Sequence, residues 1–282
     1  MPDSSPGGPG TSDEVVGPSR LDVALVARGL ARSRNHAAAL VKDGLVRVDG
    51  RGVVKPAMAV EPGQIIEIDE VADYVGRAAY KLIGALDAFG LDPTGMTCLD
   101  AGASTGGFSQ VLLERGAARV IAVDVGHGQL SPALEPEIRA GRLVSLEGVN
   151  VRELTAAQLE PHRANRPIEL VVADLSFISL GLVLPALVAA APGADLVVLI
   201  KPQFEVGRGG VREGIVRDPG LRADAISGVL WSAHDLGLRV AGLVPSTIIG
   251  THGNSEYLAH LSPRVGGSPS EWSQRITELA GG

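Results

Sequence analysis

Cysteine, aromatic residues and long apolar runs are scarce in this chain of 282 residues. Its single cysteine, Cys98, excludes a disulfide framework and a multi-cysteine metal site, and we assign no metal ligands. The longest apolar stretches, within 182–192 and 196–200, are too short to span a bilayer, and the first residues do not form an export signal. With 3% aromatic residues, recognition of RNA bases by stacking has little support. We therefore expect a cytoplasmic protein without stable membrane association.

The net charge of −7 is unevenly distributed along the chain. Residues 20–60 carry eight basic and three acidic residues, so the acidic excess lies in the remainder. A basic segment on an acidic body is typical of an attached nucleic-acid-binding module, although an ordinary solvated face would also account for the charge. The candidate RNA-binding residues are Arg20, Arg28, Arg32, Arg34, Lys42, Arg47 and Arg51.

Local patterns separate an amino-terminal part from the rest of the chain. Residues 1–19 have almost no apolar residues and are expected to form a disordered tail. Residues 20–76 predict a small α+β RNA-binding domain with its linker. The expected elements are a short helix that ends at Gly29, a second helix that begins at Ser33 and ends at Gly44, a hairpin turn at Asp49 and Gly50, and a strand at 64–68.

Residues 77–282 alternate apolar strands with helical stretches, which predicts βαβ units. Strands that are apolar throughout are typical of a parallel sheet that is buried on both faces. The predicted fold class is therefore α/β, with a Rossmann-like, mostly parallel sheet. The expected strands are 96–100, 120–124, 143–147, 170–174, 196–201, 239–245 and 257–261, at least one of the last two being antiparallel, and the expected helices are 105–115, 180–191 and 221–236.

A glycine-rich loop follows the first strand of this sheet. Gly102, Gly106 and Gly107 let the backbone approach a ligand closely, at the crevice where doubly wound sheets bind cofactors. Asp124 ends the next strand, where a carboxylate can accept hydrogen bonds from the ribose of a dinucleotide or of S-adenosylmethionine. Asp100, just before the glycines, favours S-adenosylmethionine because an anion there complements a sulfonium or amino group and not a pyrophosphate.

Only four of the 25 basic residues are lysines. A lysine that is kept in an arginine-rich chain is a candidate for chemistry, since an amine can lose its proton and a guanidinium cannot. Lys81 and Lys201 are the candidates here. Lys201 and Asp174 each follow an apolar strand, so both should face the crevice of the glycine loop. The alternative is an Asp174–Lys201 ion pair that only holds two loops together.

Five short motifs occur at 77–82, 100–108, 173–177, 201–205 and 252–256. Their sequences and their order resemble the TlyA family, the hemolysin-named ribosomal RNA ribose methyltransferases with an FtsJ-like catalytic domain. Residues 20–68 are similar to the αL RNA-binding motif of ribosomal proteins and pseudouridine synthases. The chain departs from the family at Ala78, where relatives usually have glycine.

The resemblance implies methyl transfer from S-adenosylmethionine to a ribose 2′-hydroxyl of ribosomal RNA, within a ribosomal subunit. Our hypothesis for the mechanism is that Lys201 accepts or shares the hydroxyl proton while Asp174 and Glu256 orient the two amines. The implied catalytic tetrad is Lys81, Asp174, Lys201 and Glu256. The residues assigned to the cofactor are Asp100, Gly102, Ser104, Gly106, Gly107, Phe108, Asp124 and Asn150.

Three other functions are weighed against this one. They are a catalytically inactive protein that docks on the ribosome, a membrane-acting hemolysin and an NAD-dependent oxidoreductase. A further open point is the arginine-rich loop after Lys201, which either closes on RNA or is an ordinary solvated loop. Its arginines are Arg208, Arg212, Arg217 and Arg222.

Overall fold

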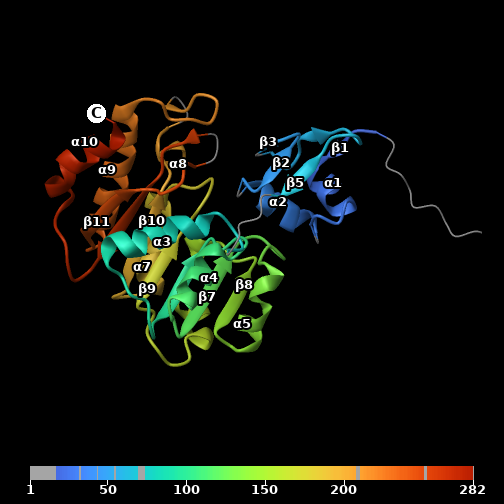
Figure 1. Ribbon diagram of the computed structural model, residues 1–282. Coiled ribbons are helices and arrows are strands. Elements are labelled where there is room, and N and C mark those ends of the chain that lie inside the picture. The colour runs from blue at the N-terminus through green and yellow to red at the C-terminus, as the bar shows by residue number, and fades with distance from the viewer. Residues whose placement is uncertain are drawn as a thin grey trace, which may run out of the picture.

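The protein consists of a small amino-terminal body and a larger body built on a long sheet (Figure 1). Apart from 17–19, the predicted tail lies outside the residues that the structure describes, as do Arg32, Arg208 and the side chain of Lys42. The computed structural model describes residues 17–31, 33–42, 44–53, 55–68, 74–207, 210–250 and 253–281.

The amino-terminal body packs two helices against short antiparallel strands. Strands β3, β2 and β5 form one sheet in that order, and β1 pairs with β4. Its core consists of apolar residues spaced along the helices and strands, of which Leu21, Leu25, Val41 and Val46 are fully buried. The elements are β1 (Ser19–Arg20), α1 (Leu21–Ala27), α2 (Arg34–Lys42), β2 (Val46–Val48), β3 (Arg51–Gly52), β4 (Ala59–Val60) and β5 (Ile66–Ile68).

The turn and cap residues of this body act as the sequence predicts. The hydroxyl of Ser33 accepts a hydrogen bond from the His36 amide at 3.2 Å, which caps α2. Asp49 and Gly50 have φ values of 50° and 74°, the left-handed pair that a two-residue hairpin requires. The expected helices and hairpin are therefore confirmed.

The larger body contains a seven-stranded sheet in the order β11-β12-β10-β9-β6-β7-β8. Strand β12 is antiparallel to both of its neighbours, and the other pairs are parallel. The predicted α/β class and the antiparallel strand near the carboxyl end are confirmed. The strands are β6 (Thr97–Ala101), β7 (Arg119–Asp124), β8 (Leu143–Glu147), β9 (Leu170–Ala173), β10 (Asp195–Ile200), β11 (Arg239–Pro245) and β12 (Tyr257–Ser262).

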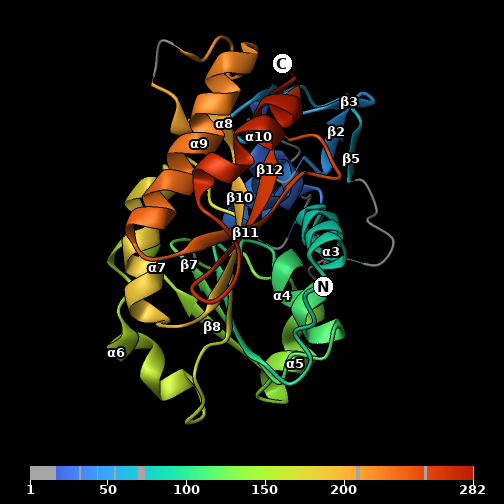
Figure 2. The ribbon, with the colours of Figure 1, turned by 90° about the vertical axis from the view of Figure 1, so that its left-hand side faces the viewer.

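Helices cover both faces of the sheet. Successive residues of its apolar strands point to opposite faces, so both faces are apolar and are buried under helices. Cys98 and Val120 pack under α3 and α4, whereas Leu99 and Ile121 pack under α7 and α9 (Figure 2). Among the described residues no helix is long and apolar enough to cross a membrane. The helices are α3 (Ala78–Phe89), α4 (Gly107–Glu114), α5 (Glu135–Arg139), α6 (Ala156–Leu159), α7 (Leu184–Ala190), α8 (Pro202–Glu205), α9 (Pro219–Asp235) and α10 (Ser273–Ala280).

The helices of the larger body differ from the sequence prediction in two respects: one predicted helix is divided, and α3, α5, α6, α8 and α10 were not predicted. The helix expected at 180–191 is divided into a 3₁₀ turn, η4 (Leu180–Leu182), and α7, because Pro185 can be accommodated only in the first turn of a helix. Helix α3, which precedes the first strand of the large sheet, was not predicted. It places Lys81 beside the carboxyl ends of the strands, so this missed element matters for the site.

Candidate active site

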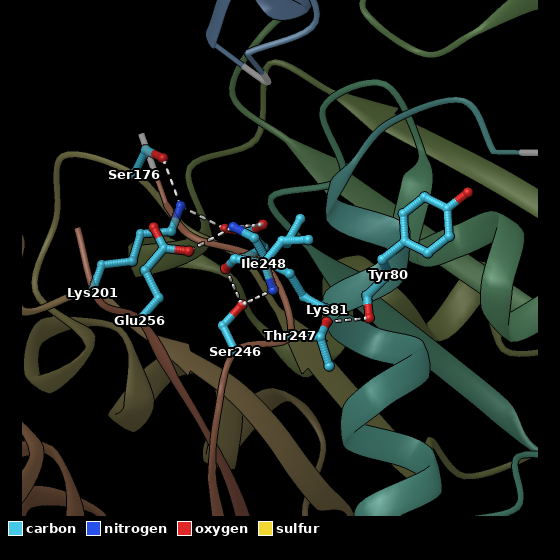
Figure 3. Close-up of polar contacts among 9 residues, drawn as sticks. Tyr80, Lys81, Ser176, Lys201, Ser246, Thr247, Ile248 and Glu256 are labelled. Carbon is cyan, nitrogen blue, oxygen red and sulfur yellow. Dashed lines mark hydrogen bonds and ion pairs between the residues drawn. The ribbon is translucent and has the colours of Figure 1, made fainter. Parts of the chain in front are cut away.

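Four charged side chains from separate parts of the chain meet at the carboxyl edge of the sheet (Figure 3). Lys81 lies on α3, Asp174 and Lys201 directly follow β9 and β10, and Glu256 directly precedes the antiparallel strand β12. The Lys81 amine is 2.6 Å from the Glu256 carboxylate and 4.0 Å from the Asp174 carboxylate. The Lys201 amine is 2.6 Å from the other oxygen of Asp174. The four residues that the resemblance groups together are thus neighbours in space.

The four groups form a chain of alternating charge that is largely removed from solvent. The two lysine side chains are each 10% exposed, that of Asp174 is 14% exposed and that of Glu256 is 2% exposed. Burial alone would raise the pKa of Asp174, but the ammonium groups of Lys201 and Lys81 outweigh burial and hold that pKa below its usual range. Asp174 is therefore an ionised carboxylate that bridges the two amines.

Two neighbouring segments hold this chain of charges in place. The hydroxyl of Thr247 donates to the carbonyl of Tyr80 at 2.9 Å, which ties the segment before Glu256 to the helix that carries Lys81. Gly250 lies against Glu256, and a Cβ atom at this position would collide with the carboxylate. A side chain at position 250 would therefore displace the Glu256 carboxylate from its place beside Lys81.

The loop after β9 supplies a contact that the sequence prediction missed. The Lys201 amine donates a hydrogen bond to the Ser176 hydroxyl at 3.0 Å. Phe177 follows in a left-handed conformation, with φ of 67°, and its side chain is exposed at the cavity wall. Both residues lie in the 173–177 motif, but their roles depend on the loop conformation, which the sequence does not reveal.

Glu205 is a second residue that sequence reasoning missed. It ends α8, four residues after Lys201, and its carboxylate accepts hydrogen bonds from the Ser179 hydroxyl at 2.6 Å and the Leu180 amide at 2.9 Å. Burial is the main cause of a raised pKa for Glu205, although both hydrogen bonds oppose it. This side chain therefore ties the loop after β9 to the turn after Lys201.

A cavity of about 730 Å³ opens beside the tetrad and extends over the glycine loop. Its size is in the range of small-molecule and cofactor sites. All four tetrad residues line it, and Val53 of the amino-terminal body forms part of its wall. Six of the residues assigned to the cofactor also line the cavity, namely Gly102, Ser104, Gly107, Phe108, Asp124 and Asn150.

The glycine loop is held close to the tetrad. Gly102 has φ of 87°, and a Cβ atom there would lie 2.7 Å from the backbone oxygen of Asp174. Asp124 accepts hydrogen bonds from the amides of Ser104 and Gly126, at 2.8 Å and 2.7 Å. These contacts orient the Asp124 carboxylate on the cavity wall. Each of its oxygens has a second lone pair that could accept a ribose hydroxyl.

Gly106 and Asp100 are the two assigned cofactor residues that do not line the cavity. Gly106 begins α4 with φ of 93°, and a Cβ atom there would collide with Leu130 and Leu134, so packing explains this glycine. Asp100 points towards α4, because it shares the sheet face of Cys98. Its position beneath the loop differs from the direct contact that the sequence predicts.

Asp100 is fully buried and only partly satisfied. One carboxylate oxygen accepts a hydrogen bond from the Ser109 hydroxyl at 2.7 Å, and the other has no hydrogen-bond partner among the described residues. Burial raises the pKa of Asp100 to about 7. A buried, unsatisfied carboxylate beneath the loop fits a cofactor that carries a positive charge.

The predicted RNA-binding residues have different environments. Arg20 and Arg34 both form ion pairs with Asp22. Arg28 donates hydrogen bonds to the backbone carbonyls of the turn at 61–64, and Arg47 donates to the carbonyl of Gly50. Arg51 is exposed at the hairpin.

Arg222, which the sequence analysis assigned to the basic loop after Lys201, lies on α9. It donates to three backbone carbonyls, including that of Ala280. This arginine therefore joins α9 to the end of α10, and its guanidinium is engaged within the protein.

The Asp100 environment predicts a pH dependence of stability. The native state favours the protonated carboxyl, so the free energy of unfolding falls as pH rises from the usual pKa of 3.8 through the native value of about 7. Asp100→Asn keeps an acceptor for Ser109 and removes this titration. Urea denaturation at about pH 5 and about pH 8 should show a smaller loss of stability for Asp100→Asn than for the unmutated protein. Equal losses would contradict the assignment.

Comparison with known proteins identifies the family of the chain. Residues 74–262 match the FtsJ-like methyltransferase family, and residues 19–66 match the S4 domain family. The 16S/23S rRNA (cytidine-2′-O)-methyltransferase TlyA of Mycobacterium tuberculosis is 50% identical over 247 residues, which are 86% of this chain and 89% of that protein.

Two further relatives carry the name hemolysin. Hemolysin A of Brachyspira hyodysenteriae is 36% identical over 243 residues, which are 86% of this chain and 98% of that protein. A solved structure of a hemolysin-named protein from Streptococcus thermophilus superposes with a TM-score of 0.70 at 36% identity, covering 95% of this chain and 96% of that one. The chain belongs to the TlyA family and combines an S4 domain with an FtsJ-like methyltransferase domain.

Proposed function

We propose that this protein transfers a methyl group from S-adenosylmethionine to a ribose 2′-hydroxyl of ribosomal RNA. The observation that carries the proposal is the buried Lys-Asp-Lys-Glu chain on the wall of the cavity that also contains the glycine loop. The names of the relatives support the reaction class, and that of the Mycobacterium tuberculosis protein specifies cytidine. From the proposed ribosomal substrate we infer a cytoplasmic location.

The residues around the cavity fit S-adenosylmethionine, which supplies an activated methyl group on a sulfonium. Gly102 and Ser104 line the cavity, and the backbone of Gly102 lies close to that of Asp174, so this part of the loop would hold the cofactor. Asp124 would accept hydrogen bonds from its ribose hydroxyls, and Asn150 lies on the wall where its base would bind. Asp100 would act from beneath the loop, as a buried carboxylate near the positive end of the cofactor.

Lys201 is the group best placed to accept the hydroxyl proton. As the oxygen–methyl bond forms and the sulfur–methyl bond breaks, the proton of the 2′-hydroxyl must leave the oxygen. In the proposed step Lys201 first releases its own proton to solvent and then accepts that of the hydroxyl, while Asp174, 2.6 Å away, stays ionised. Lys81 and Glu256 keep Asp174 oriented, so the four residues act as one unit. Alignment of the reacting atoms supplies the larger part of the rate enhancement, about 7–11 kcal/mol in an ideal case.

Methyl transfer to unmethylated rRNA tests this proposal. The unmutated protein should produce 2′-O-methylated nucleosides, which mass spectrometry of nuclease digests can identify. Lys201→Arg should lower turnover by about 10²–10⁴-fold because the charge survives and the proton acceptor does not. Calorimetry should show that the variant still binds the cofactor.

Lys55→Arg is the matched control, because Lys55 is an exposed lysine outside the cavity. Its turnover should equal that of the unmutated protein. Normal turnover by Lys201→Arg would remove Lys201 from the proposed role. If the unmutated protein transfers no methyl group to rRNA, the proposed function itself is wrong.

Glu205 generates a second prediction about the same reaction. Glu205→Ala removes the acceptor of two hydrogen bonds, so the loop with Ser176 loses its tie to the turn after Lys201. We expect kcat to fall by about 10- to 100-fold, since small misplacements of reacting groups have effects of this size. Glu205→Gln keeps an acceptor and should recover most of the activity. Glu213→Ala, at an exposed glutamate nearby, is the control. Unchanged kcat for Glu205→Ala would contradict the positioning role.

A further inference from the structure

A buried carboxylate lies between two arginines of the amino-terminal body. Asp22 is 4% exposed, and its two oxygens accept a pair of hydrogen bonds from Arg20, both at 3.0 Å. The second oxygen also accepts a hydrogen bond from Arg34 at 3.2 Å. The hydrogen bond from Arg20 is the main cause of a lowered pKa for Asp22, so the carboxylate is ionised at neutral pH.

The carboxylate is mounted on a fixed part of the fold. The amides of Leu21 and Asp22 donate to the carbonyls of Met58 and Pro56 at 2.8 Å and 2.9 Å, which anchors the start of α1. Leu21 itself is fully buried in the core. Asp22 therefore has little freedom to move, and the arginines that bind it take their positions from it.

The two guanidinium groups, in contrast, remain open to solvent. The side chain of Arg20 is 52% exposed and that of Arg34 is 60% exposed, whereas that of Asp22 is only 6% exposed. One nitrogen from each arginine contacts the same oxygen, at 3.0 Å and 3.2 Å, so these nitrogens lie within about 6 Å of each other. Without the carboxylate, two like charges at this separation would repel each other.

We propose that Asp22 holds Arg20 and Arg34 as a preformed clamp for one phosphate group of the RNA backbone. The inference rests on the proposed RNA substrate and specifies how the amino-terminal body would bind its backbone. Arg20 uses Nε and Nη2 to bind Asp22, and Arg34 uses Nη2, so the remaining donors of each guanidinium can contact phosphate oxygens, and the site as a whole keeps a net charge of +1. Because Asp22 fixes both guanidinium groups in advance, binding loses less side-chain entropy than it would with two free arginines.

The proposed clamp and a purely electrostatic account predict opposite changes in RNA affinity. Asp22→Asn and Glu67→Gln each remove one negative charge from the amino-terminal body, and Glu67 is an exposed residue of β5. If charge alone governed binding, both variants would bind RNA more tightly. If Asp22 orients the arginines, Asp22→Asn should bind about 3- to 10-fold more weakly, and only Glu67→Gln should match or exceed the unmutated protein.

The test is a titration of fluorescently labelled, unmethylated 16S and 23S rRNA transcripts with the full-length protein at several salt concentrations. For Asp22→Asn the plot of log affinity against log salt should become shallower by roughly one unit, because one phosphate contact is lost. Circular dichroism shows whether each variant is folded. Asp22→Glu keeps the charge and displaces the carboxylate by one methylene, so it should also weaken binding. This variant serves as the test if the asparagine variant does not fold.

The outcomes separate this inference from the proposed function. Binding by the unmutated protein together with equal or tighter binding by folded Asp22 variants would overturn the clamp and leave the methyltransferase proposal intact. Failure of the unmutated protein to bind either rRNA would overturn both.

Discussion

The carboxylate of Asp174 lies between two ammonium groups, and the arrangement of the site depends on this contact. Charged groups are removed from water only where opposite charges meet them with good geometry, and here Lys81, Lys201 and Glu256 provide that compensation. Removal of one member of such a buried set leaves an unpaired charge and typically costs about 3–5 kcal/mol. The same interactions therefore hold the loops in position and align the proposed reacting groups.

The sheet explains how residues so far apart in the chain reach one place. Asp174 and Lys201 follow adjacent parallel strands, so both emerge at the same edge. Glu256 reaches this edge from the opposite direction because it precedes an antiparallel strand paired with β10. The close approach of Gly102 to the backbone of Asp174 brings the glycine loop alongside. The glycine loop and the four charged residues thus share one cavity because of the strand order.

Much of the fold could be predicted from the sequence, because apolar periodicity and turn residues are local signals. Strands 143–147 and 239–245 have the predicted bounds, and the Asp49-Gly50 hairpin forms as its sequence indicates. The helix at 180–191 was wrong in one respect, since Pro185 divides it. Helix α3 was missed, although Lys81 itself was a candidate because lysine is scarce in the chain and because its motif resembles the family.

The site was predictable only in part, for a physical reason. Strand ends place Asp174 and Lys201 at one edge without further knowledge, but the contacts of Ser176 and Glu205 depend on loop geometry. Asp100 was predicted from its place at the strand end, yet strand alternation points its side chain towards α4. Charge counting placed Arg20 and Arg34 in a basic segment and could not reveal that one buried carboxylate holds both.

The most direct test of the account is a crystal structure of the protein with S-adenosylhomocysteine. We expect the ligand in the cavity lined by Gly102 and Asp124, with its sulfur facing Lys201 and Asp174 and with the Lys81–Glu256 pair intact. A ligand bound outside this cavity, or a sulfur that faces away from the tetrad, would contradict the account.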